Sequence, residues 1–310
     1  MNQNLKENFR TPVTFIIFNR PDTTAKVFEV IRAMQPPKLL CIADGPRLNH
    51  PSDIEKCTET RKIIDQVDWD CQVLKNFSDV NLGLKKRVSS GLDWVFDTVD
   101  ESIILEDDCL PGEDFFYYAQ ELLEKYRYDT RIMSISGNNF QFGRNQIIDS
   151  YYFSRYFHCW GWATWKRAWK YYDIHMKLLP ETLQNDYLNS IFSNSSKHIK
   201  YWEDIFKRAY NDGIKTWDYQ FLFSSWVQNG LHILPRVNLV SNLGFGNQST
   251  NTLDKNNKLS NLKINSLSFP LTHPNIVMRN FHADEYTQNT IFSLSMINKI
   301  KSRIKNIISI

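Results

Sequence analysis

The stretch IILEDDCLP, residues 103–111, decides the fold class of this chain. Its first three residues are continuously apolar, which predicts a strand covered on both faces, as in the parallel sheet of an α/β domain. Three carboxylates, Glu106, Asp107 and Asp108, follow directly, and Pro111 then stops the strand. The stretch therefore predicts a buried parallel strand with an acidic carboxyl end.

The three adjacent carboxylates are expected to have a positively charged partner. Side by side they repel one another and raise each other's pKa unless a cation lies among them. Mg²⁺ or Mn²⁺ takes oxygen ligands and keeps positions open for phosphate oxygens, and ligands of open α/β sheets bind outside the carboxyl ends of the strands. A solvated acidic turn that caps a helix beginning near residues 111–114 explains the same acids equally well. The sequence leaves both interpretations open.

Strands and helices alternate through the first half of the chain. Strands are predicted over residues 13–18, 38–43 and 71–74, with helices that end near residues 34, 66 and 96 between them. This order implies right-handed crossovers and a doubly wound parallel sheet. The second half is more irregular, with a helical stretch at residues 195–211 and a strand at 230–235.

No linker composition separates the two halves, so we expect one α/β catalytic domain over residues 1–285. Its nucleotide-binding half would cover about residues 11–140 and its acceptor-side half about residues 141–285.

Composition narrows the functional classes. The 310 residues are 42% hydrophobic and 23% charged, as in ordinary globular proteins, and the net charge of +3 is too small to indicate a nucleic-acid partner. The five cysteines are odd in number and show no paired CxxC spacing, so neither a zinc site nor a disulfide framework is indicated. Without a signal-peptide core or an apolar run of ~20 residues, the sequence predicts a cytoplasmic protein.

Polar residues recur at the ends of three predicted strands. Asn19 and Arg20 follow the first strand, Asp44 follows the second, and the three acids follow the strand at 103–105. One edge of the sheet would then carry a guanidinium for phosphate, an acid that accepts from a base N–H, and a metal ligand. Individually, Arg20 also fits a turn at a helix start, and Asp44 before Gly45 fits an ordinary turn.

With these residues in place, about residues 12–250 resemble the GT-A fold of nucleotide-sugar glycosyltransferases, a Rossmann-like α/β fold with a mostly parallel central sheet flanked by helices. The likeness is to the N-acetylglucosaminyltransferase I type, in which Glu-Asp-Asp replaces the more common Asp-x-Asp. Residues 104–116 and 132–138 carry its most specific part.

The resemblance implies a role for each residue at the sheet edge. Asp108 would bind Mn²⁺ or Mg²⁺, while Glu106 and Asp107 would face the sugar and ribose of the donor. Arg20 would contact the phosphates or the base of the nucleotide, with Asn19 beside it. Asp44 would contact the uracil edge, and Arg87 would reach the nucleotide from the basic turn at residues 85–87.

The same family has a Gly-Trp segment and a later Trp-Asp pair near its catalytic base. This chain has Gly161-Trp162, which would contact the donor, and Trp217-Asp218. Inverting transfer needs a base that takes the proton of the acceptor hydroxyl, and Asp218 is the candidate. Tyr219 stands where the family has a second acid, and a helix-capping role for Asp218 is an equal alternative.

Two later segments bear on substrates. Residues 242–250 resemble the loop that closes over the donor in this family, although an ordinary surface loop also explains them. Residues 286–310 predict a C-terminal amphipathic basic helix, in which an apolar stripe is bordered by Lys299, Lys301, Arg303 and Lys305. This pattern is typical of a peripheral anchor on the inner face of a membrane, and equally of a helix packed on the domain.

The sequence as a whole predicts a metal-dependent, inverting glycosyltransferase of polysaccharide biosynthesis. It would move a hexosyl or N-acetylhexosaminyl group from a nucleotide diphosphate sugar, most simply UDP-linked, to a glycan or lipid-linked acceptor. One alternative is a sugar-phosphate nucleotidyltransferase, which would carry a phosphate loop rich in glycine and lysine where residues 18–21 have none. The other is a catalytically inactive glycan-binding protein that uses the aromatic second half.

Overall fold

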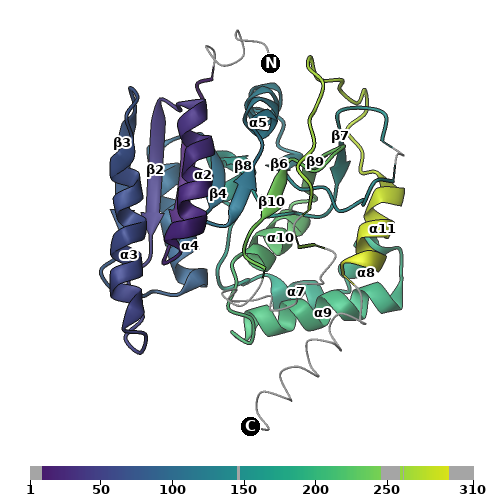
Figure 1. Cartoon of the computed structure of the whole chain (residues 1–310). Helices are drawn as coiled ribbons and strands as arrows, with labels where there is room; N and C mark the ends of the chain where they lie inside the picture. Colours follow the sequence, from purple (N-terminus) through teal and green to yellow (C-terminus); the bar gives the residue numbers. More distant parts are fainter. Residues whose placement is uncertain (1–8, 145–146, 246–258, 261, 293–310) are drawn as a thin grey trace.

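A computed structural model describes residues 9–144, 147–245, 259–260 and 262–292. One eight-stranded sheet crosses the molecule in the order β3-β2-β1-β4-β8-β6-β9-β7 (Figure 1). Its first four strands are parallel: β1 (Val13–Ile17), β2 (Lys38–Ala43), β3 (Gln72–Phe77) and β4 (Glu101–Glu106). The predicted α/β class and the parallel sheet of the first half are therefore confirmed.

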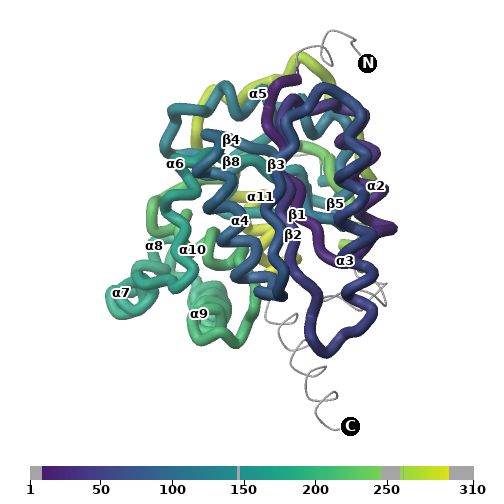
Figure 2. The backbone as a smooth tube through the Cα atoms, turned by 90° about the vertical axis from the view of Figure 1, so that its left-hand side faces the viewer, coloured from purple at the N-terminus to yellow at the C-terminus, as the bar shows by residue number. Residues whose placement is uncertain are grey.

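Helices cover both faces of this sheet, which explains the continuously apolar strands. In β1, Phe15 packs into one hydrophobic core and its neighbour Ile16 into the other, because successive side chains of a strand point to opposite faces. The first core includes residues of α2 (Pro21–Met34) and α5 (Glu113–Lys125), with α3 (Ser52–Ile63) beside α2. The second includes residues of α4 (Leu84–Thr98), α9 (Ser196–Tyr210) and α10 (Asp218–Val227), and Figure 2 shows these helices across the sheet from α2 and α3.

The second half adds strands of both directions to the same sheet. β8 (Trp162–Trp165) is antiparallel to both β4 and β6 (Ile132–Ser136), β9 (Leu231–Pro235) is parallel to β6, and β7 (Tyr151–Ser154) is antiparallel to β9 at the edge. The sheet as a whole is mostly parallel, as expected, but strict βαβ repetition ends at β4. Strands from both halves of the chain thus share one sheet.

The acidic stretch leads into a second, small sheet that the sequence did not predict. After Asp108 the chain forms β5 (Cys109–Pro111), which pairs antiparallel with β10 (Val240–Asn242). Pro111 is the last residue of this short strand, where a missing N–H is tolerated. The pairing carries residues 240–245 of the second half to the end of β4.

The remaining elements are short, apart from one helix near the C-terminus. They are η1 (Ile64–Gln66), α6 (Lys166–Trp169), α7 (Leu179–Gln184), α8 (Leu188–Phe192) and α11 (Phe281–Thr290). The predicted basic helix at 286–310 overlaps the end of α11, and residues 293–310 lie outside the described part of the chain. Within the described residues, we find no helix with the length and apolarity to cross a membrane.

Candidate active site

The ends of β1 and β4 bring the predicted phosphate-binding arginine to the acidic stretch. The register pairs Ile16 with Glu106, so the residues that follow each strand meet at the carboxyl edge of the sheet. The Phe18 N–H donates to Asp107 Oδ2 at 3.0 Å. Arg20 Nη1 donates to Asp108 Oδ2 at 2.6 Å and to Asp107 Oδ1 at 3.3 Å. The two segments therefore form one charged cluster.

Negative charge dominates this cluster. Burial raises the pKa of Glu106, and the charges of Asp108 and Asp107 raise it further. Burial also raises the pKa of Asp107, an effect that Arg20 partly offsets. For Arg20, burial lowers the pKa, but the neighbouring carboxylates outweigh it and the pKa lies above its ordinary value. Of the described residues, Arg20 is the cation that contacts these acids, so a further positive charge would be stabilised here.

The segment after β10 closes around Asp108 from the other side. The Leu243 N–H donates to the Asp108 carbonyl oxygen at 2.7 Å, and the Gly244 N–H donates to Asn242 Oδ1 at 2.7 Å. A Cβ on Gly244 would lie 2.2 Å from Asp108 Oδ2. The other carboxylate oxygen, Oδ1, accepts from the Cys109 thiol at 3.5 Å. Glycine at position 244 therefore keeps the space beside the Asp108 carboxylate free of a side chain.

Asp218 is the first residue of α10, and its charge acts on the acidic stretch. Its Oδ1 accepts from the Thr216 hydroxyl. Burial raises the pKa of Asp218, and the Thr216 hydrogen bond and nearby backbone N–H groups oppose this shift. The charge of Asp218 also raises the pKa of Glu106. The structure thus places the predicted base within electrostatic range of Glu106 in the acidic stretch.

Cys159 lies within electrostatic range of these acids, which the sequence did not reveal. Burial raises the pKa of its thiol, and the charges of Asp218, Glu106 and Asp108 add to the shift. Next to it, the Trp160 N–H donates to Asn138 Oδ1 at 3.0 Å. The only signal in the sequence was that Cys159 lies two residues before the predicted Gly161-Trp162 segment.

Asp44 follows β2, and Arg87 lies in the first turn of α4, from which it reaches Asn76 of the neighbouring strand β3. The Asp44 carboxylate accepts from the backbone N–H groups of Leu82 at 2.8 Å and Gly83 at 3.0 Å. Arg87 Nη2 donates to the carbonyl and side-chain oxygens of Asn76 at 2.6 and 2.5 Å. Burial lowers the pKa of Arg87, and the charge of Asp44 opposes this. Both residues already organise the loop from β3 to α4, and their contacts with a nucleotide remain a prediction.

Asn19 turns away from the acidic cluster. Its Nδ2 donates to Asp53 Oδ1 at 2.8 Å, and Arg47 Nε donates to Asp53 Oδ2 at 2.6 Å. The hydrogen bond from Arg47 lowers the pKa of Asp53 to about 2. Asn19 therefore anchors the loop after β1 to the start of α3.

Gly161 and Trp162 lie behind the site, within the packing of the sheet. The Trp162 side chain is fully buried and stacks on Trp217 with 5.3 Å between ring centroids. Gly161 has φ +61°, and a Cβ there would lie 2.7 Å from Val240 Cγ2. The structure gives this pair a role in packing, and its predicted contact with a donor remains a prediction.

The donor set at Asp108 fits a hard divalent cation that also binds a substrate. Among the described residues, no group of three or more His, Cys, Asp or Glu side chains forms a complete protein site for a metal ion. Mg²⁺ is commonly held by one or two carboxylates, with the remaining positions filled by substrate phosphates and water. The Asp108 carboxylate, with Asp107 next to it and no side chain at Gly244 to displace it, meets this requirement.

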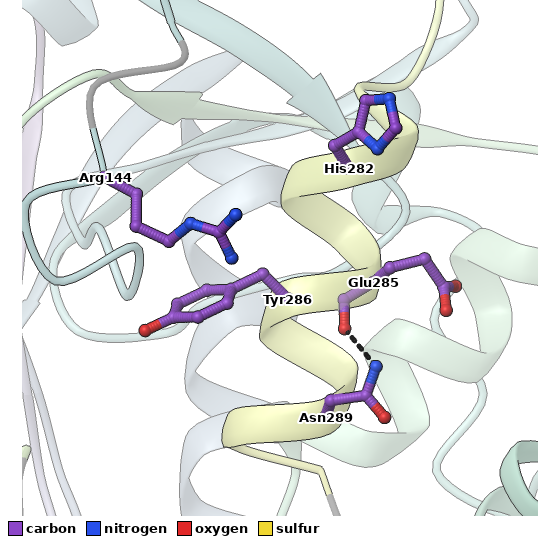
Figure 3. A pocket seen from close by; sticks show the side chains of 5 residues that line it. All are labelled: Arg144, His282, Glu285, Tyr286 and Asn289. Atoms are coloured by element: carbon purple, nitrogen blue, oxygen red, sulfur yellow. Dashed lines mark hydrogen bonds between the residues drawn. The ribbon is translucent and has the colours of Figure 1, made fainter.

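A separate cavity lies on the exposed side of α11. Its volume is about 530 Å³, and its lining residues are Arg144, His282, Glu285, Tyr286 and Asn289 (Figure 3). The Arg144 guanidinium carbon lies 4.4 Å from the centroid of the Tyr286 ring. Neither the acidic stretch nor Asp218 lines this cavity.

Comparisons with known proteins give only distant likenesses. No family model matches the chain, and no curated protein matches its sequence. Solved structures similar to it include GalNAc-T7 with UDP, GalNAc and Mn²⁺, at 12% identity and a TM-score of 0.47, over 81% of this chain and 46% of that one. Mouse xyloside xylosyltransferase 1 in its apo form is similar at 9% identity and a TM-score of 0.35, over 70% of this chain and 82% of that one.

A third similar structure is the 4-diphosphocytidyl-2C-methyl-D-erythritol synthase of Anaerococcus prevotii, at 12% identity and a TM-score of 0.31, over 73% of this chain and 100% of that one. This chain spans less than half of the GalNAc-T7 chain. At such identities and TM-scores, none of these proteins defines a family or an activity for this chain.

Proposed function

We propose that this protein is a glycosyltransferase of GT-A type that uses a nucleotide diphosphate sugar. One observation carries the proposal: Arg20, the three acids of residues 106–108 and Asp218 meet at the carboxyl edge of the sheet. Ligands of open α/β sheets bind at this edge. A guanidinium, a metal-binding carboxylate and a separate half-buried acid are the groups that sugar transfer from a diphosphate requires.

Each residue has a place in the proposed donor site. Asp108 would hold Mn²⁺ or Mg²⁺, which supplies a positive charge to the leaving diphosphate when bound. Arg20 contributes a second positive charge on the same side. Glu106 and Asp107 orient the sugar and ribose hydroxyls, since carboxylate oxygens accept their hydrogen bonds. Asp44, Arg87 and Asn19 shape the loops on the nucleotide side.

Asp218 is the proposed catalytic base. As the acceptor oxygen bonds to the anomeric carbon, its proton passes to an Asp218 carboxylate oxygen and the diphosphate departs from the opposite face. The half-buried setting raises the pKa of Asp218, which strengthens it as a base near neutral pH. This arrangement gives inversion at the anomeric carbon.

For the substrates, we propose a UDP-linked hexose or N-acetylhexosamine as donor and a glycan or lipid-linked acceptor in polysaccharide biosynthesis. The expected location is cytoplasmic, with peripheral membrane contact through the basic segment of residues 286–310.

Substitution of Asp108 tests the donor site. In Asp108→Ala, metal-dependent release of UDP from a panel of UDP-sugars should fall by at least about 100-fold, while the thermal unfolding curve stays near that of the wild type. The matched control is Asp79→Ala, an exposed acid on the loop after β3, which should keep full activity. Full metal-dependent activity in Asp108→Ala would contradict the proposal.

Two further assays separate the alternatives. Release of pyrophosphate from a nucleoside triphosphate and a sugar phosphate would indicate a nucleotidyltransferase. Glycan binding without any saturable binding of UDP in the presence of Mn²⁺, measured by calorimetry, would indicate an inactive glycan-binding protein.

A further inference from the structure

Arg20 holds the carboxylate that the proposed cation needs. Its Nη1 lies 2.6 Å from Asp108 Oδ2 and 3.3 Å from Asp107 Oδ1, and its side chain is only 21% exposed. A guanidinium at these distances forms a charge-assisted hydrogen bond, which is stronger than a neutral one. A divalent cation that approaches the same oxygen meets the like charge of Arg20.

Among the described residues, the other groups that contact Asp108 belong to closely packed backbone or to a short side chain. The Gly244 backbone lies so close to Oδ2 that a Cβ would stand 2.2 Å from this oxygen. The Cys109 thiol donates to Oδ1 at 3.5 Å, and the Leu243 N–H holds the Asp108 backbone at 2.7 Å. The carboxylate is therefore fixed in place, and Arg20 is the one neighbour among these with a long, movable side chain.

We propose that Arg20 is an internal counter-ion that blocks the cation position at Asp108 until the diphosphate of the donor draws the guanidinium away. The proposal rests on the proposed function and adds the coupling between cation and nucleotide. Guanidinium groups bind phosphate oxygens in the same forked geometry as carboxylates, so the diphosphate is a competent alternative partner. Departure of Arg20 from Asp108 leaves an uncompensated carboxylate for the cation.

This exchange makes Mn²⁺ and UDP binding mutually dependent. Each ligand raises the affinity for the other by the same factor, because coupling free energies are reciprocal, and typical factors are about 5–150. Removal of the Arg20 charge has an unusual consequence: the protein without nucleotide should bind Mn²⁺ more tightly, although it loses a residue of the donor site.

Titration of Mn²⁺ with and without UDP, followed by electron paramagnetic resonance of the free ion, tests the exchange. In the wild type, UDP should raise the Mn²⁺ affinity by about tenfold or more. In Arg20→Gln, the Mn²⁺ affinity without UDP should rise several-fold above the wild type, and the enhancement by UDP should shrink. The matched control is Arg47→Gln, which removes another Arg–Asp pair and should leave the Mn²⁺ affinity at the wild-type value.

Gly244→Ala should change the Mn²⁺ affinity in the opposite direction from Arg20→Gln, although both variants act on the Asp108 carboxylate. The Gly244 backbone is not in the left-handed region, so the added methyl group acts only through its contacts with Asp108 and Asn242. The Mn²⁺ affinity should fall both with and without UDP, and thermal unfolding checks that the variant is folded.

The outcomes separate this inference from the proposed function. If UDP enhances Mn²⁺ binding in the wild type but Arg20→Gln without UDP binds Mn²⁺ no more tightly than the wild type, the counter-ion role is wrong and the donor site stands. If no protein binds Mn²⁺ under either condition, both the metal-dependent function and this inference are overturned.

Discussion

Among single residues, Asp284 shows how strongly a buried charge depends on its partners. It is fully buried at the start of α11, and its carboxylate accepts from the Ser154 hydroxyl at 2.6 Å and from Arg155 Nε at 3.3 Å. Arg279 lies 3.5 Å away on the other side. Burial raises the pKa of Asp284, and the Ser154 hydrogen bond and the two arginines oppose this. The cluster fastens α11 to the end of β7.

Removal of this carboxylate should cost far more stability than removal of an exposed one. We expect Asp284→Ala to lower the free energy of unfolding by about 3–5 kcal/mol, because the buried Arg155 guanidinium loses its buried carboxylate and, among the described residues, keeps only the partly exposed Glu285 as an acidic partner. The control, Glu203→Ala, breaks the exposed pair with Lys207 and should cost less than about 1 kcal/mol. Urea denaturation measures both values, and equal losses would contradict the role of Asp284.

At the scale of elements, the candidate site depends on loops that are tied together across strand ends. The connection from β3 to α4 has few regular backbone hydrogen bonds of its own, and Asp44 of the neighbouring strand supplies acceptors for Leu82 and Gly83. The Asn81 side chain donates to Asp44 Oδ2 at 3.1 Å. One carboxylate therefore fixes the turn from which α4, with Arg87, begins.

Asp44→Ala should loosen this turn locally. Hydrogen bonds to a charged acceptor contribute about 1.5–3 kcal/mol each, so exchange of the Leu82 and Gly83 amide hydrogens should accelerate by roughly tenfold to a hundredfold. Hydrogen exchange followed by mass spectrometry measures the effect. Asp79→Ala, in the same loop but exposed, should leave both amides protected, and unchanged protection in Asp44→Ala would count against this role.

For the whole molecule, two histidines buried beside the second core link stability to pH. Burial lowers the pKa of both His158 and His232 to about 3. The His158 ring packs on Phe140 at 4.3 Å, and His232 Nδ1 pairs with the Ser134 hydroxyl at 2.8 Å. Among the described residues, no group bonds His232 Nε2 or either ring nitrogen of His158. Neither ring is placed to carry a proton in the folded state.

The folded protein should therefore lose stability in acid. Above pH 6.5 each histidine is neutral in both states and contributes no pH dependence. Below that value the unfolded chain takes up protons that the folded chain excludes until about pH 3, so the free energy of unfolding falls by up to about 1.4 kcal/mol per pH unit for each histidine. The dependence is measured as the slope of unfolding free energy against pH between 6 and 4.

His158→Phe isolates this effect from the carboxylates that titrate in the same range. In this variant, unfolding should take up about one proton fewer than in the wild type. The slope of the unfolding free energy against pH should therefore be smaller by about 1.4 kcal/mol per pH unit. His50→Asn changes an exposed histidine and should keep the wild-type slope. Identical slopes in His158→Phe and the wild type would show that His158 is protonated within the fold.

Much of the first half could be predicted because its signals are local. The apolar runs that became β1, β2 and β4 are short and flanked by helical patterns, and parallel strands necessarily present their carboxyl ends, with Arg20, Asp44 and Asp108, at one edge. The β5–β10 pairing could not be predicted in this way. It joins residues far apart in the chain, and short strands carry little periodicity.

The sequence by itself determined the α/β class, the succession of the first four strands along the chain and the gathering of acids at one strand end, because side-chain periodicity and turn residues act over a few positions. Only the tertiary structure decided that Arg20 pairs with Asp108, that Gly244 lies against the same carboxylate and that Cys159 joins the acids while Trp162 is buried behind them. These contacts depend on how distant segments pack, and packing is fixed by the shape of the whole core.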